Sequence, residues 1–211
     1  MLARLWASSP VLRVMRHHQY VQSTEHAATA TPRVVAWTPE QFALRVNEAM
    51  NIYVRAMNYP QHAAGQRAVT ARRHATHPGF ACQAALLDDD TLVGFGYGYT
   101  TRPGQWWHDL VRRALDEEQA QQWLGNAFEL SELHVLPDYQ GGGTGRVMLG
   151  ELAEGLPHEA MLLSTPDIDT RAFRLYRHAG FVDLRRHYLF PGDVRPFAVL
   201  GARLPLQLDG G

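Results

Sequence analysis

The sequence predicts an α/β domain, and three segments carry this prediction. A strand at about 127–136 runs through a glycine-rich loop into a helix at about 144–155. Two apolar runs, 80–87 and 92–99, are separated by three aspartates, which is typical of a β-hairpin. An amphipathic helix precedes the hairpin. Helices and strands therefore alternate along the chain, as an α/β (α+β) architecture requires.

The composition is that of an ordinary globular protein, with 211 residues of which 45% are hydrophobic and 19% charged. The formal net charge of −1 leaves no broad basic surface for nucleic acid or an anionic membrane. No apolar run approaches the roughly 18 residues that span a bilayer. The single Cys82 excludes an internal disulfide and favours a reducing compartment. We therefore expect a cytoplasmic protein that contacts neither nucleic acid nor membrane.

Residues 1–30 are expected to form a loosely structured extension, and residues 31–211 the folded domain. The first 24 residues contain three arginines and no acidic residue, a composition also found in organellar transit peptides. Apolar positions are sparse there, so an extension is the preferred interpretation. Arg13 and Arg16 interrupt the apolar segment that a secretory signal needs.

The organised region begins with a short strand at 34–36 and a helix start. Thr38 is the predicted N-cap, Pro39 occupies the first helical position and Gln41 completes a capping box. A second helix is predicted at 62–77. Its arginines form either a solvated face or part of a mouth for an acidic substrate.

The last third of the sequence alternates again between strands and helices. The predicted elements are a strand at 160–165, a helix at 170–178 and strands at 182–190 and 197–204 joined by a turn at Pro191-Gly192-Asp193. No cysteine or histidine grouping has zinc spacing, so no metal is expected.

The loop that follows Gln140 is suited to binding an anion. Glycines reach positive φ and allow close approach, while the first amides of a helix are unpaired and lie at its positive end. Arg146 stands where a Walker loop needs Lys and where a dinucleotide fingerprint starting at Gly141 needs a third glycine. The loop therefore predicts a phosphate site of another class, with a plain connecting turn as the alternative.

The spacing of Gln140, Gly143 and Gly145 resembles the pyrophosphate loop of the GCN5-related N-acetyltransferases, the GNAT superfamily. A second segment, about 30 residues downstream, resembles the late helix of that family. It contains, in order, Asp169, Ala172, Leu175, Tyr176 and the pair Gly180-Phe181. Asp169 stands where the family usually has Asn, which affects one polar contact to pantetheine, and Asp caps a helix about as well as Asn.

The resemblance covers roughly residues 34–204 and implies the GNAT acyl-CoA N-acyltransferase fold, a mixed, mostly antiparallel sheet flanked by helices. It also implies transfer of an acetyl group from acetyl-CoA to a primary amine. The implied CoA-binding residues are Leu133, His134, Val135, Gln140, Gly141, Gly142, Gly143, Thr144, Gly145, Arg146, Asp169, Ala172 and Tyr176. The expected partners are acetyl-CoA and an amine-bearing acceptor. The sequence leaves open the acceptor's identity, a longer acyl donor and a homodimer.

The resemblance assigns Tyr176 as the general acid that protonates the CoA thiolate. Glu129 matches a frequently acidic position for the general base, with Glu132 and His134 as rivals and a water chain as another route. A regular strand would place Glu129 and His134 on opposite faces, whereas a bulge would change this alternation. A non-catalytic acyl-CoA-binding module is the alternative function, and a nucleotide-binding P-loop protein is disfavoured because the lysine is missing.

Two features extend the minimal domain. Gly94, Gly96 and Gly98 alternate along the second hairpin strand, which indicates that a covering helix or a ligand approaches that face closely. Residues 102–126 form a helical insertion before the central strand, with Trp107 and Leu110 in helical spacing. This insertion packs on the sheet as scaffold, covers the acceptor site as a lid, or does both.

Overall fold

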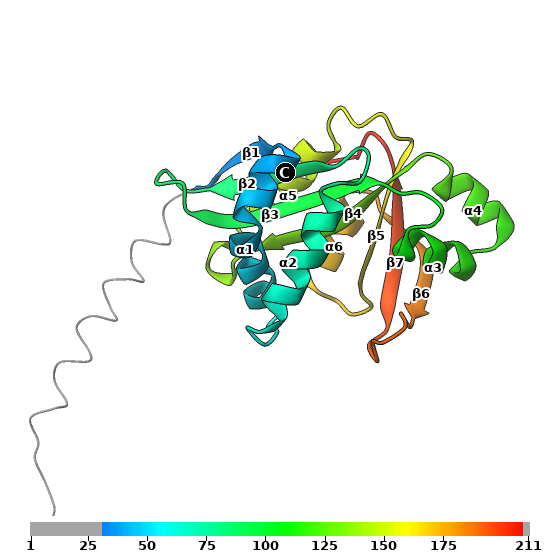
Figure 1. Cartoon of the computed structure of the whole chain (residues 1–211). Coiled ribbons are helices and arrows are strands. Elements are labelled where there is room, and N and C mark those ends of the chain that lie inside the picture. Colours follow the sequence, from blue (N-terminus) through cyan, green and yellow to red (C-terminus); the bar gives the residue numbers. More distant parts are fainter. Residues whose placement is uncertain (1–30, 209–211) are drawn as a thin grey trace, which may run out of the picture. The chain divides into compact units, whose positions relative to one another are not determined.

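The computed structural model describes residues 31–208, so the extension expected at 1–30 lies outside the described residues (Figure 1). The strands are β1 (Arg33–Trp37), β2 (Ala81–Leu86), β3 (Leu92–Thr100), β4 (Ala127–Val135), β5 (Ala160–Pro166), β6 (Val182–Tyr188) and β7 (Phe197–Arg203). The helices are α1 (Pro39–Ala56), α2 (Ala63–His74), α3 (Trp106–Ala114), α4 (Glu117–Leu124), α5 (Thr144–Ala153), α6 (Arg171–His178) and the short 3-10 helix η1 (Pro137–Tyr139). Within residues 31–208, no helix is long and apolar enough to cross a membrane.

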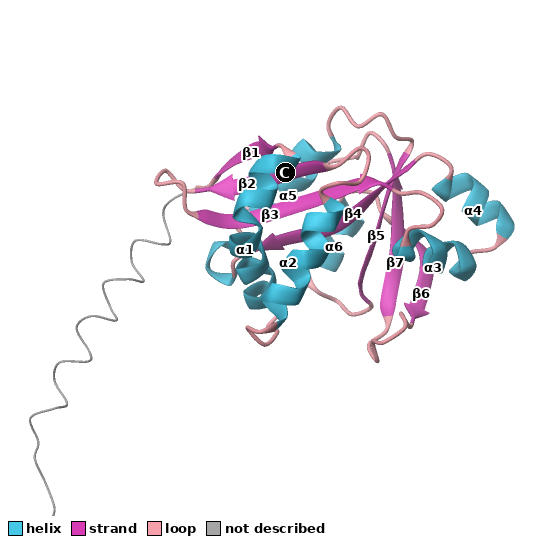
Figure 2. Cartoon of the chain, in the orientation of Figure 1, coloured by secondary structure: helices cyan, strands magenta, loops and turns pink. Residues whose placement is uncertain are grey.

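The strands form one sheet in the order β1-β2-β3-β4-β5-β7-β6, with helices on both faces (Figure 2). β4 and β5 are parallel, and every other neighbouring pair is antiparallel. The prediction of a mixed, mostly antiparallel sheet flanked by helices is therefore confirmed.

Three clusters of apolar side chains show which helices pack on which face of the sheet. Phe42 of α1 packs on Tyr97 of β3, with ring centroids 4.9 Å apart. α5 and α6 share a core with Phe128, whereas α3 and α4 share one with its neighbour Ala127. Adjacent residues of a strand point to opposite faces, so α5 and α6 cover the face opposite to α3 and α4.

The start of α1 follows its predicted capping box. Thr38 Oγ1 accepts a hydrogen bond from the Gln41 amide at 3.2 Å, and Gln41 Oε1 accepts one from the Thr38 amide at 2.9 Å. Pro39 occupies the first turn, where its missing N–H costs nothing. This helix boundary could therefore be read from three residues.

The insertion between β3 and β4 contains two short helices, because Asp116 starts a new one. The Asp116 side chain accepts from the Gln119 amide at 2.7 Å, so Asp116 is the N-cap of α4. Trp123 of α4 lies against Gly201 of β7, and the Arg203 guanidinium stacks 4.3 Å from its ring. The insertion is thus packed against β7.

The glycine face of β3 is filled by protein. A Cβ atom on Gly98 would lie 2.1 Å from the Glu129 carbonyl oxygen and 2.3 Å from the Phe128 ring. A Cβ on Gly94 would lie 3.2 Å from the terminal methyl of Met148 in α5. A covering helix, one of the two predicted causes, accounts for these glycines together with the neighbouring strand. A ligand, the other predicted cause, does not.

We predict that Gly98→Ala lowers the free energy of unfolding by about 3 kcal/mol, because the added methyl meets a backbone carbonyl that cannot move freely. Gly65→Ala in α2 is the matched control, since a Cβ there meets nothing within 4 Å. It should raise stability by about 0.5–1 kcal/mol through helix propensity. Urea unfolding measures both, and equal midpoints for the two variants would contradict the close packing at Gly98.

Candidate functional site

A cleft of about 1530 Å³ opens where the central strands separate. β4 and β5 pair only at Ala127/Ala160, Phe128/Met161 and Glu129/Leu162. Beyond these pairs the two strands diverge, and residues 130–135 and 163–166 line the cleft. The sheet therefore contains its own opening for a ligand.

The glycine loop forms one end of the cleft. Gly141 and Gly143 have φ values of +88° and +85°, and a Cβ on any of residues 141–143 would meet nothing within 4 Å. Within the described part of the chain, the amides of residues 141–143 donate no hydrogen bond. Gln140 Nε2 donates to the Val135 carbonyl at 2.9 Å and so ties the loop to β4. Open backbone donors at a helix start fit a phosphate group.

The predicted CoA-binding residues differ in how they meet the cleft. Those that line it are Leu133, His134, Val135, Gln140, Gly141, Gly143, Gly145, Arg146, Ala172 and Tyr176. Gly142 and Thr144 are outside the lining, and Thr144 is buried. Asp169 also lies outside it, at the exposed surface, with its carboxylate 2.7 Å from Arg174.

The prediction that Asp169 caps the late helix is wrong. Thr170 is the N-cap of α6, and its Oγ1 accepts from the Phe173 amide at 3.0 Å. Asp and Thr are both suitable N-cap residues, and Thr170, which directly precedes the first residue of α6, takes that position. The predicted stop at Gly180 is present, with φ +86°.

Tyr176 reaches the cleft from α6. Its side chain is 6% exposed and its ring packs 5.5 Å from that of Phe181. Burial, together with the negative charge of Glu132, raises the pKa of the Tyr176 phenol. The hydroxyl makes no hydrogen bond to any residue among 31–208, so its proton is available to a ligand.

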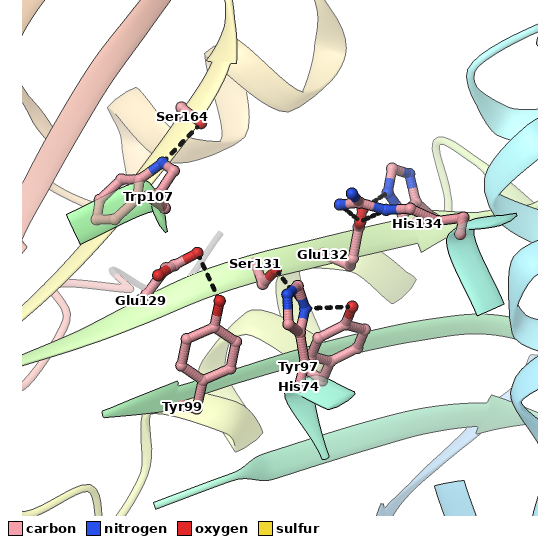
Figure 3. A network of polar contacts seen from close by, with 10 residues as sticks. His74, Tyr97, Tyr99, Trp107, Glu129, Ser131, Glu132, His134 and Ser164 are labelled. Carbon is pink, nitrogen blue, oxygen red and sulfur yellow. Dashed lines mark hydrogen bonds and ion pairs between the residues drawn. The ribbon is translucent and has the colours of Figure 1, made fainter. Parts of the chain in front are cut away.

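A bulge in β4 places the candidate bases on one face. Tyr97 pairs with Glu132 and Gly98 with Leu130, so Ser131 is the extra residue. Glu129 and Glu132 then point to the same face of the sheet, each beside its partner on β3, Tyr99 and Tyr97 respectively (Figure 3). His134 also joins that face, two residues beyond Glu132.

Glu132 is held as a carboxylate. Arg67 of α2 donates through Nε to Glu132 Oε1 at 2.7 Å, and His134 Nε2 donates to Oε2 at 2.6 Å. Burial alone would raise the pKa of Glu132, but Arg67 and His134 outweigh it and lower that pKa to about 2. A group that is such a weak base is poorly suited to accept a proton from an amine.

Glu129 has the opposite character. It is 4% exposed and Oε1 accepts from the Tyr99 hydroxyl at 3.0 Å, while Oε2 is buried without any partner in the described residues. Burial raises the pKa of Glu129 to about 8, against the lowering effects of Tyr99 and Arg67. This residue lines the cleft, and one of its carboxyl oxygens has no hydrogen-bond partner among the described residues.

Two site residues come from α2, which the sequence left as a solvated face or a mouth. Arg67 and His74 lie seven residues apart, two helical turns, and both line the cleft. His74 Nδ1 lies 3.1 Å from the Tyr97 hydroxyl and 3.4 Å from Ser131 Oγ. Burial and the Arg67 charge lower the pKa of His74 to about 4, so it is neutral at pH 7.

The insertion contributes both to the scaffold and to the cleft wall. Trp107 is 7% exposed and its Nε1 donates to Ser164 Oγ of β5 at 3.1 Å. Trp106 is 62% exposed and its ring lies 5.8 Å from that of Phe190. Both tryptophans line the cleft, so α3 fixes one wall beside Glu129 (Figure 3).

Comparison with known proteins agrees with this geometry. The Acetyltransferase (GNAT) family profile matches residues 46–181. A GCN5-like protein acetyltransferase of Mycobacterium tuberculosis is 35% identical over 197 residues, which cover 80% of this chain and 96% of that protein.

Solved structures share the fold at low sequence identity. The ribosomal-protein-S18-alanine N-acetyltransferase of Escherichia coli is 15% identical, with a TM-score of 0.56 over 82% of this chain and 93% of that one. A Salmonella typhimurium structure with its cofactor acetyl-CoA is 12% identical, with a TM-score of 0.57 over 86% of this chain and 96% of that one. The chain therefore belongs to the GNAT family of acetyltransferases, the acetyl-CoA-dependent family that its glycine loop and late helix resemble.

Proposed function

We propose that this acetyltransferase moves the acetyl group of acetyl-CoA directly to a primary amine of its acceptor. One observation carries the proposal: the glycine loop, Glu129 and Tyr176 line a single cleft. A phosphate site, a proton acceptor and a proton donor are the three functions that such a transfer needs from the protein.

The free amides of residues 141–143 and the start of α5 are proposed to hold the CoA pyrophosphate. Arg146, which lines the same end of the cleft, adds positive charge. Backbone groups of Leu133, His134 and Val135 lie between the loop and Glu129 along β4, where they are available to pantetheine and to the thioester oxygen. A fixed amide aimed at the developing oxyanion is worth about 2.7–4 kcal/mol of barrier.

Glu129 is the proposed general base. Its carboxylate accepts the proton that the acceptor ammonium must lose before the nitrogen can attack the thioester carbon. A pKa of about 8 makes it a stronger base than Glu132, whose pKa is about 2. The Tyr99 hydroxyl positions the carboxyl by binding the other oxygen.

Tyr176 is the proposed general acid. As the nitrogen forms its bond to the acetyl carbon and the carbon–sulfur bond breaks, the phenol gives its proton to the departing thiolate. The second proton that the nitrogen loses on becoming an amide restores the phenol. Burial raises the pKa of the phenol, and the same dry surroundings make a thiolate a stronger base. No covalent enzyme intermediate is needed, and Cys82 is buried in the core.

The acceptor is proposed to be an amine carried by another protein. The Mycobacterium tuberculosis relative is named a protein acetyltransferase, and it matches 80% of this chain. The exposed Trp106 at the cleft wall offers apolar surface beside the amine site, as binding pockets commonly do.

We predict that Gly143→Val abolishes CoA binding while the protein stays folded, because the side chain would fill the open space above the loop amides. Gly155→Val is the matched control. Gly155 also has positive φ and open space, but it lies outside the cleft lining. Calorimetric titration with CoA measures both, and unchanged affinity in Gly143→Val would refute the pyrophosphate site.

We predict that Tyr176→Phe lowers turnover by about 10²–10⁴-fold with little change in CoA affinity, because only a proton donor is lost. The ring contact with Phe181 is retained. Thioester consumption with a panel of amines measures turnover. If turnover equals that of the wild type while chemistry limits the rate, Tyr176 is a packing residue.

We predict that kcat/KM rises with pH and levels off above about pH 8, as Glu129 loses its proton. Glu129→Gln should remove this transition and lower activity by about 10²–10⁴-fold. The glutamine oxygen can still accept from Tyr99, so the fold is preserved. A pH profile centred near 8 that persists in Glu129→Gln would assign the base elsewhere.

The same substitution has a signature in stability. The folded-state pKa of Glu129 lies above its ordinary value of 4.5, so the stability that its protonated form contributes is complete below that value and lost as pH rises through 8. Glu129→Gln should therefore gain stability relative to the wild type between pH 5 and 9, by the order of a few kcal/mol. Urea unfolding at both pH values measures the difference.

A further inference from the structure

The 211-residue sequence contains 20 arginines and no lysine. No side chain of this sequence therefore carries a primary amine. A guanidinium stays protonated in proteins and has no free electron pair with which to attack a thioester. For an enzyme that acetylates amines, the chain has no side chain of the class it modifies.

Some of the arginines lie where an amine would be exposed to the reaction. Six line the cleft: Arg67, Arg73, Arg146, Arg171, Arg174 and Arg195. A lysine at such a position would face the bound thioester at a millimolar or higher effective concentration. It would compete with any acceptor from solution.

Acetylation would also change the electrostatics of the cleft. An acetylated lysine is neutral, so each modification would remove one positive charge from the lining of the cleft. Arginine supplies the same charge and cannot be neutralised in this way. A cleft lined by guanidinium groups therefore keeps its positive charge during repeated turnover.

We propose that the lysine-free composition keeps this enzyme from acetylating itself, so that the amines it modifies belong to other molecules. The inference rests on the proposed amine acetylation. It assigns a function to the cleft arginines beyond their charge: they provide cationic contacts that are inert to the reaction.

Two adjacent positions on α2 supply a matched test. Arg73 is exposed, lines the cleft and makes no side-chain hydrogen bond or ion pair with the described residues. Arg72 is also exposed, but it donates to Asn47 at 3.2 Å and does not line the cleft. Arg73→Lys and Arg72→Lys thus place the same amine one residue apart, inside and outside the site.

Each variant is incubated with acetyl-CoA alone, and acetyl groups are followed by intact mass and peptide mapping. Lys at position 73 should gain one acetyl group at a rate independent of enzyme concentration, and Glu129→Gln in the same chain should suppress it. Lys at position 72 should react at least about 100-fold more slowly. The wild type should gain none on any side chain.

A second cleft variant, Arg171→Lys, guards against a single side chain that points the wrong way. If external amines are acetylated but neither position 73 nor position 171 reacts faster than position 72, the inference is overturned. Acetyl groups on wild-type side chains would overturn it as well. If the wild type acetylates no amine from a broad panel, the proposed function fails and this inference fails with it.

Discussion

The site depends on one irregularity, the extra residue that Ser131 adds to β4. The bulge brings Glu129 and Glu132 to the same face of the sheet, opposite Tyr99 and Tyr97. In a regular strand, residues three apart point to opposite faces, and one carboxyl would lie under α5. One extra residue in a strand can therefore turn two acids that are three positions apart toward the same cleft.

The two glutamates differ in character because their neighbours differ. Both are buried, and burial alone raises the pKa of a carboxyl. Glu132 has a cation from α2 and an imidazole donor, and these outweigh burial. Glu129 has one phenol donor and a free oxygen, so burial prevails. Arg67 stabilises one acid as a charged structural group, and the other remains able to exchange a proton with a ligand.

Much of the fold and half of the site could be predicted from local sequence. The capping box at Thr38, the turn glycines and the strand before Gln140 are short-range signals, and each element that they predict is present. A bulge in β4 was one of two alternatives that the sequence left open, because the bulge at Ser131 is set by the pairing of β4 with β3. The position of Arg67 was left open between a solvated face and a cleft mouth, and His74 was missed, for a related reason: the residues that they contact lie on distant strands.

The short parallel seam between β4 and β5 has a mechanical consequence. Only three residue pairs join the half of the sheet that carries α1 and α2 to the half that carries α3, α4 and the last strands. Hydrogen bonds that would normally cross the sheet are missing along the cleft, and fewer residue pairs join β4 to β5 than join any other neighbouring strands. A ligand that bonds to both strands would replace part of the missing sheet. The bound molecule would then act as a temporary strand, and the fold would be stiffest when it is carrying its substrate.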